Sequence, residues 1–188
     1  VLTQSHLADA LAASGAPIVG VRATSVDDVK EGLTLLGNVI DQEEEAIEVI
    51  AAIQARIDTA TTSATTARSV LILISDADRN LYAAKPESYP GAIADILNLT
   101  NVAAGLADSG PFPGFTLFSP EQALTANPDI ILAISPAPEP APRLSSVLPL
   151  VPGYGDLSAV TEGRLGELSP DLFLQAPGPR IVDAVEEL

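Results

Sequence analysis

Two aspartates are the side chains in this sequence best placed for acid–base or metal chemistry. Asp76 and Asp78 stand in "DADRN", directly after the apolar run "SVLILIS" at 69–75. The loop after a buried strand is a common place for an α/β active site, and neighbouring carboxylates can hold a metal ion. Aspartate is also a frequent turn residue, so a solvated turn explains the same pattern. The motif alone leaves both interpretations open.

Other catalytic signals are missing from the sequence. It contains no cysteine, and His6 is the only histidine. It has no Gly-x-Ser-x-Gly elbow, no phosphate-binding loop and no metal-spaced histidine pair. Acid–base chemistry would therefore depend on carboxylates. We expect a protein that is not an enzyme.

Composition limits the partners. The chain has 188 residues, 47% of them hydrophobic, and a mean hydropathy of +0.30, which excludes disorder and allows one domain or two small ones. No apolar run approaches the roughly 20 residues of a membrane helix. The net charge of −16, from 25 acidic and 9 basic residues, disfavours nucleic acid and anionic lipid as partners.

Strands and helices are predicted to alternate from Arg68 onward. Fully apolar or β-branched runs predict strands at 69–75, 79–84, 130–134 and near 164–168, and helical spacing predicts helices at 88–99, 119–127 and 177–188. Residues 100–118 are predicted to be mostly loop. This alternation predicts an α/β lobe of three layers with a mostly parallel sheet.

Two helices are predicted before this lobe. The first is capped by Ser25 and ends or bends at Gly37. The second is a long helix that covers 43–60, crosses the edge of the lobe and frays in the low-complexity stretch 59–67. Its isoleucines, Ile47 among them, are expected on one side, and its glutamates on a solvated side.

The start of the chain predicts a strand end, a helix and a strand within 1–22. Such a segment exposes apolar side chains unless it has partners, so we expect it to pack on another copy, forming a homodimer, or to fold back on its own lobe. The apolar residues concerned are Leu7, Leu11, Ile18, Val19 and Val21.

The order of these motifs resembles a known family. The segments that carry the resemblance are "GAPIVGVRATSVDDVKEGLTLLG", the glutamate-rich helix, "VLILIS", "LYAAKPESYPGAIADILNLTNVA", "FSPEQALTANPDIILAI", "LPLVPGYGDLSAV" and "GRLGELSPDLFLQAPGPRIVDAVEEL". Together they resemble the helical-backbone (class III) periplasmic substrate-binding proteins of ABC importers, which carry vitamin B12, haem or ferric siderophores.

The resemblance implies two α/β lobes joined by one long helix, with the ligand held between them. Residues 1–24 would be the end of the first lobe, 25–67 the helices that include the connecting helix, and 68–188 the C-terminal α/β lobe. Most of the first lobe would have no counterpart here. The location implied is periplasmic or extracellular, either tethered to a membrane or free.

The resemblance also implies ligand-binding and docking residues. Aromatic and polar side chains of the second lobe would face the ligand, and Glu121 would pair with arginines of the membrane permease. Each ring could equally be packed against its neighbours without touching a ligand, and Arg180 could pair with a neighbouring acid. Glu121 could simply stabilise its helix by interacting with the helix dipole. The implied ligand-binding residues are Tyr82, Phe112, Phe115, Phe173, Gln175 and Arg180.

The ligand implied is a metal chelate, namely cobalamin, haem or a ferric siderophore, and no intrinsic cofactor is expected. Haem would need an axial tyrosine or histidine, from His6 or the three tyrosines, Tyr82, Tyr89 and Tyr154. Arg79 and Lys85 could form a local basic cleft. Two alternatives remain: a scaffold or interaction domain of the same fold that does not act in transport, and a carboxylate-dependent hydrolase that uses Asp76.

Overall fold

A computed structural model gives the conformation of most of the chain. It describes residues 15, 17, 19–21, 23, 25–63, 68–138, 140–175 and 178–188. The prediction of a strand, a helix and a dimer contact in residues 1–22 lies almost wholly outside these residues and stays a prediction. Within the described residues, no helix is both long enough and apolar enough to cross a membrane.

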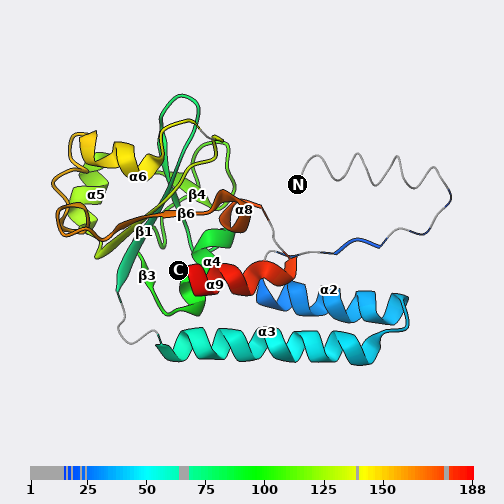
Figure 1. Ribbon diagram of the computed structural model, residues 1–188. Helices are drawn as coiled ribbons and strands as arrows, with labels where there is room; N and C mark the ends of the chain where they lie inside the picture. The colour runs from blue at the N-terminus through cyan, green and yellow to red at the C-terminus, as the bar shows by residue number, and fades with distance from the viewer. Residues whose placement is uncertain are drawn as a thin grey trace.

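One sheet forms the centre of the lobe (Figure 1). Its spatial order is β4-β2-β1-β5-β6, and β3 pairs with the start of β1. Strands β1, β3, β5 and β6 run parallel, whereas β2 and β4 are antiparallel to their neighbours. The strands are β1 Ser69–Ser75, β2 Leu81–Ala84, β3 Thr100–Asn101, β4 Phe115–Leu117, β5 Ile130–Ile134 and β6 Leu165–Leu168.

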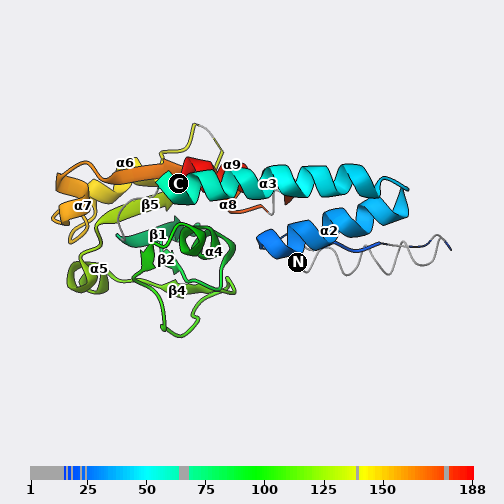
Figure 2. The same cartoon turned by 90° about the horizontal axis from the view of Figure 1, so that it is seen from below.

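Helices cover both faces of this sheet (Figures 1 and 2). Alternate residues of β1 point to opposite faces: Ile72 belongs to a core cluster with residues of α3, α4 and α9, and Leu71 belongs to a second cluster with residues of α5, α6 and α7. The predicted three-layer α/β lobe is therefore confirmed. The lobe helices are α4 Tyr89–Ile96, α5 Pro120–Ala126, α6 Leu144–Val147, α7 Ser158–Thr161, α8 Pro170–Phe173 and α9 Ile181–Glu187, with 3-10 turns η1 Leu148–Leu150 and η2 Gly178–Arg180.

The two helices before the lobe form an antiparallel hairpin that extends beyond it (Figures 1 and 2). They are α2 Val26–Val39 and α3 Glu43–Ser63. The sequence predicted an end or a bend at Gly37, but α2 continues past it to Val39. Gly37 is instead a point of close contact between the two helices, because a Cβ built on it would lie 2.7 Å from Cβ of Ala46. The turn is closed by the Gln42 amide, which donates to the Gly37 carbonyl at 2.8 Å.

The inner end of the hairpin is attached to the lobe, and the outer end is not. Ile53 and Ile57 are 5% exposed in the core beneath α9. Arg56, which lies between them in α3, links the helix to α9, because its guanidinium lies 2.9 Å from Asp183 and 2.6 Å from Glu186.

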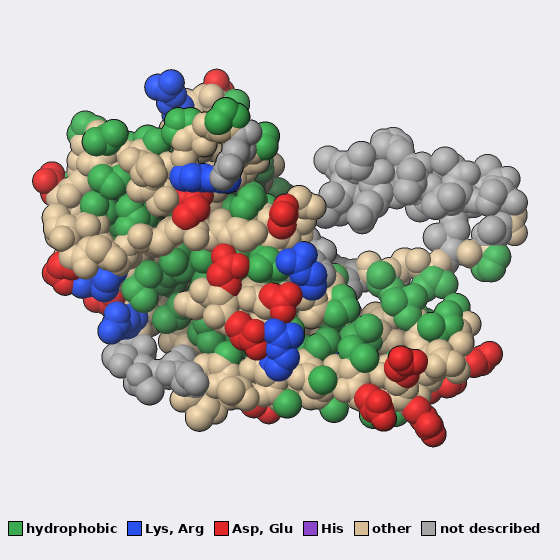
Figure 3. All heavy atoms as spheres, in the orientation of Figure 1, with side chains coloured by type: hydrophobic (Ala, Val, Ile, Leu, Met, Phe, Trp, Pro, Cys, Tyr) green, Lys and Arg blue, Asp and Glu red, His purple; other side chains and the backbone are tan. Residues whose placement is uncertain are grey.

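The outer end of the hairpin leaves apolar side chains in contact with solvent. Ile47 is 66% exposed, unlike Ile53 and Ile57, because only the inner half of α3 has a lobe to cover it. Other apolar residues near the turn, including Val39 and Ile40, are also exposed. Figure 3 shows green and red side chains together at this end, which agrees with the predicted solvated glutamates.

Three boundaries in the lobe differ from the sequence-based expectation. The strand expected at 79–84 begins only at Leu81, because residues 76–80 form a turn. Residues 100–118, expected as loop, contain the short strands β3 and β4. The final helix begins with a 3-10 turn, and α9 starts at Ile181.

Candidate functional site

The carboxyl ends of three parallel strands meet at one edge of the sheet. β1 ends at Ser75, β5 is followed by Ser135, and β6 is followed by Ser169. Beyond this edge lie the turn 76–80, the proline-rich loop from Ser135 and the helix α8. Open α/β sheets bind ligands outside the carboxyl ends of their strands, so this edge is the candidate site.

Asp76 is used to build the turn between β1 and β2. Its Oδ1 accepts hydrogen bonds from the amides of Asp78 at 2.9 Å and Asn80 at 2.8 Å, and its Oδ2 accepts from the Asn80 side chain at 2.8 Å and the Tyr82 hydroxyl at 3.1 Å. These donors, the Asn80 side chain first, lower the pKa of Asp76. In the described residues no three acidic or histidine side chains gather as a metal site. The four hydrogen bonds account for Asp76 as a turn residue.

Tyr82, Phe112 and Phe115, three of the residues for which the resemblance implies ligand binding, form one aromatic cluster. The Tyr82 and Phe112 rings meet edge to face at 5.4 Å and 87°, and the Phe112 and Phe115 rings at 6.3 Å and 71°. Tyr82 is 5% and Phe115 is 9% exposed, whereas Phe112 is half-buried. Burial, and then Asp76, raises the pKa of Tyr82. Phe112 is thus the member of the cluster that reaches the surface.

The loop that carries Phe112 is held by a buried lysine. The Lys85 ammonium pairs with Asp108, and Glu87 lies 3.6 Å away. Asp108 also accepts a hydrogen bond from the Gly114 amide at 3.1 Å. Asp108 raises the pKa of Lys85, and Lys85 lowers the pKa of Asp108. Lys85 is therefore neutralised within the protein, and Arg79 is left without the basic neighbour that the sequence suggested.

The three predicted residues near the C-terminus occupy different environments. Phe173 is 1% exposed and packs in the core under α9, so its ring presents no face to a ligand in this conformation. Gln175 is exposed, and its amide donates to Asp171 at 3.4 Å. Arg180 is exposed and lies 3.4 Å from Asp183, which is the acid pairing that the sequence left open.

Glu121 lies in the helix layer on the other face of the sheet from the aromatic cluster. It follows Pro120 in the first turn of α5, where Ser119 caps the helix and forms a capping box with Gln122. The side chain of Glu121 is exposed, and the Ser119 hydroxyl lowers its pKa. A rigid helix start thus presents an ionised carboxylate away from the rings.

The match to a known family covers most of the chain. A sequence model of the family described as "Periplasmic binding protein" matches residues 2–172. The chain belongs to this family. No curated protein matches this periplasmic binding protein.

Solved structures share the fold at low sequence identity. The haem-binding protein HutB of Vibrio cholerae has a TM-score of 0.79 at 16% identity, with 94% of this chain and 68% of that chain covered. A possible iron-binding (periplasmic solute-binding) protein from Staphylococcus epidermidis ATCC 12228 has a TM-score of 0.78 at 20% identity, covering 97% and 69%.

An ABC transporter substrate-binding protein from Listeria monocytogenes EGD-e has a TM-score of 0.74 at 19% identity, covering 98% of this chain and 72% of that chain. The matches therefore cover about seven tenths of each of these three solved chains. These likenesses confirm the α/β fold with its mostly parallel sheet.

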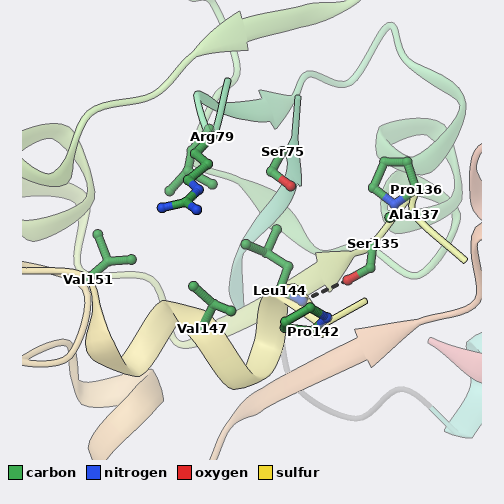
Figure 4. A pocket seen from close by; sticks show the side chains of 10 residues that line it. Ser75, Arg79, Ser135, Pro136, Ala137, Pro142, Leu144, Val147 and Val151 are labelled. Carbon is green, nitrogen blue, oxygen red and sulfur yellow. Dashed lines mark hydrogen bonds between the residues drawn. The ribbon is translucent and has the colours of Figure 1, made fainter. Parts of the chain in front are cut away.

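A cavity at the same sheet edge was not predicted from the sequence. Its volume is about 540 Å³, and its wall joins the ends of β1 and β5, the loop 135–142 and α6. Figure 4 shows Ser75 and Ser135 on one side of it and Arg79 on the other. The only sequence signal was "SPAPEPAP", a stiff loop after a buried strand. The residues that line it are Ser75, Arg79, Leu81, Ser135, Pro136, Ala137, Pro142, Leu144, Val147 and Val151.

Proposed function

We propose that this periplasmic binding protein is the ligand-binding component of an ABC importer. It carries a metal-chelate ligand, namely cobalamin, haem or a ferric siderophore, to a membrane permease. The observation that carries the proposal is the family match over residues 2–172. Structures named as haem-binding and as ABC transporter substrate-binding proteins share the fold, which supports the proposal.

The aromatic cluster supports the ligand part of the proposal. A flat macrocycle or chelate binds well to aromatic surfaces with a few polar anchors. Phe112 would touch the ligand first, with Tyr82 and Phe115 supporting its ring, and Gln175 and Arg180 would supply polar contacts. Phe173 has no direct contact in this proposal, because its ring lies inside the core.

The position of Glu121 supports the permease part. It is exposed at the start of α5, across the sheet from the rings, so one protein can touch a ligand and a permease at the same time. A rim charge of this kind contributes orientation and association rate more than affinity. The protein would act outside the cytoplasm, tethered or free, with residues 68–188 as one of two lobes and residues 1–24 belonging to the other.

The ligand part is tested by titrating the purified chain with haemin, cyanocobalamin and ferrichrome in a calorimeter. We expect one of these chelates to bind, and Phe112→Ala to weaken its binding about tenfold, the effect of roughly one lost aromatic contact. Glu121→Ala should bind it like the unchanged protein. Failure of all three chelates to bind, or equal binding by Phe112→Ala, would contradict the assignment.

The permease part is tested by uptake of the same chelate into cells that express the importer. Glu121→Ala should slow uptake while the chelate affinity stays unchanged. Glu43→Ala is the matched control, because Glu43 is also an exposed first-turn glutamate, in α3, and its loss should leave uptake intact. Equal uptake by the two variants would refute the role of Glu121.

A further inference from the structure

The cavity beside Arg79 and the aromatic cluster lie on different faces of the sheet. The cavity lies on the face of β2 opposite the aromatic cluster, because Leu81 lines the cavity whereas the next residue, Tyr82, belongs to the cluster. Its volume of about 540 Å³ lies within the range of small-molecule sites, roughly 300–1,000 Å³.

The walls of the cavity are fixed by the protein itself. The Ser135 hydroxyl accepts a hydrogen bond from the Leu144 amide at 2.7 Å, which ties the end of β5 to the start of α6 (Figure 4). Arg143 donates to the Ala137 carbonyl at 3.4 Å and so holds the loop against the same helix. Pro136 and Pro142 stiffen the loop. A site with fixed walls loses little conformational entropy when it binds a ligand.

The chemistry of the lining is an apolar body with one positive charge. Leu81, Leu144, Val147 and Val151 supply aliphatic surface. Figure 4 shows the Arg79 guanidinium extending toward the side of the cavity where Val147 and Val151 lie. Apolar walls match a hydrocarbon group, and a guanidinium matches one carboxylate through two parallel hydrogen bonds.

Arg79 differs in its partners from three other arginines of the chain. Arg56, Arg164 and Arg180 each pair with an acidic side chain, whereas no hydrogen bond or ion pair joins the Arg79 guanidinium to another described residue. The backbone of Arg79 is nevertheless fixed, with φ of 66° and its amide donating to the Asp76 carbonyl at 3.2 Å. A held backbone with an unused charge is suited to an external anion.

We propose that this cavity binds a carboxylate attached to a compact apolar group, such as an aryl or branched-chain acid, with Arg79 holding the carboxylate. Inorganic phosphate suits it less, because a small dianion leaves the aliphatic walls facing water and meets a chain of net charge −16. The carboxylate belongs either to a free small acid or to an arm of the metal chelate. This inference does not depend on the chain binding a chelate.

The test is calorimetric titration of the full chain with 2-naphthoate and with 2-naphthamide, which has the same apolar body without charge. We expect the carboxylate to bind at least about tenfold more tightly than the amide, and Arg79→Gln to remove that difference. Arg68→Gln, which removes an exposed arginine at the opposite end of β1 from the cavity, should change nothing. Val147→Trp should fill the cavity and abolish binding of both compounds.

The two sources of the carboxylate are separated by repeating the naphthoate titration in the presence of haemin, which carries carboxylate arms. Competition assigns the cavity to an arm of the chelate, whereas independent binding assigns it to a free acid. Equal affinity for naphthoate and naphthamide, or unchanged naphthoate binding by Arg79→Gln, would overturn the proposal whether or not any chelate binds.

Discussion

Replacement of Gly91 by alanine sets two opposing effects against each other at the start of α4. Alanine is favoured over glycine in helices by up to about 1 kcal/mol. Against this, a Cβ built on Gly91 would lie 1.9 Å from the Lys85 carbonyl oxygen and 2.9 Å from Cα of Pro86. Real Cβ contacts essentially never fall below 3.0 Å, so the backbone must move by about 1.1 Å.

That movement removes other interactions. The Lys85 carbonyl accepts hydrogen bonds from the Ser88 amide at 2.9 Å and the Ser88 hydroxyl at 2.7 Å, and each buried bond contributes about 1 kcal/mol. Overpacking costs roughly 1–3 kcal/mol more. After the gain in helix propensity is subtracted, Gly91→Ala should lower the free energy of unfolding by about 2–4 kcal/mol.

Urea unfolding followed by circular dichroism measures this loss. Gly166→Ala is the control, because its added Cβ would meet only Leu132 at 3.4 Å, an ordinary contact, and its stability should change by less than about 1 kcal/mol. A Gly91→Ala protein as stable as the unchanged chain, or more stable, would refute the argument that the close approach at Lys85 determines the sign.

Two further predictions concern buried and ionised groups. The Tyr89 hydroxyl is buried without a hydrogen-bond partner among the described residues, so Tyr89→Phe should leave the stability in urea unchanged or raise it by about 1 kcal/mol. Tyr154→Phe removes a hydrogen bond to the Phe118 carbonyl at 3.2 Å and should lower the stability by about 1 kcal/mol. An equal loss of stability in the two variants would contradict this prediction. Hydrogen bonds from the amide and hydroxyl of Ser69 lower the pKa of Asp129, so its stabilising effect is present above the unfolded-state pKa of about 3.9 and is lost as pH falls through the folded-state pKa. Asp129→Asn should therefore be less stable than the unchanged chain at pH ~6, and urea titrations should show this difference in stability shrinking below about pH 4. A difference that does not depend on pH would contradict the prediction, and so would an equal difference for Asp95→Asn on the exposed surface of α4.

Those parts of the fold that depend on composition over five or more residues could be predicted from the sequence. Ile130–Ile134 follows a turn and is wholly apolar, which is typical of a buried strand or a buried helix. Five residues are a usual length for a strand but too few for most helices, so the sequence predicts a strand. β3 has two residues and β4 has three, too few for a periodic signal. The exposure of Ile47 could not be predicted, because helical spacing indicates an apolar side but not how far along the helix a neighbour covers it.

The residue types of the aromatic cluster could be predicted from the sequence, but its geometry could not. Aromatic residues at 82, 112 and 115 do come together, yet the sequence could not show that Phe112 is the ring nearest the surface. Phe173 looked equivalent to the others and is buried, since its burial depends on α9 packing over it. The cavity beside Arg79 is lined by segments about 60 residues apart in the chain. A local sequence pattern does not predict that two such distant segments lie side by side.

The one-sided attachment of the α2–α3 hairpin has a consequence for how the molecule opens. Residues near Ile53, Ile57 and Arg56 share side-chain contacts with α9, so their amide protons exchange with solvent only when the lobe itself unfolds. The first two turns of α3 pack mainly on α2 around Gly37, and a helix pair without a further layer has little stability of its own. One continuous helix therefore belongs to two cooperative units, and a hydrogen-exchange gradient should run along it, from slow at the lobe to fast at the turn.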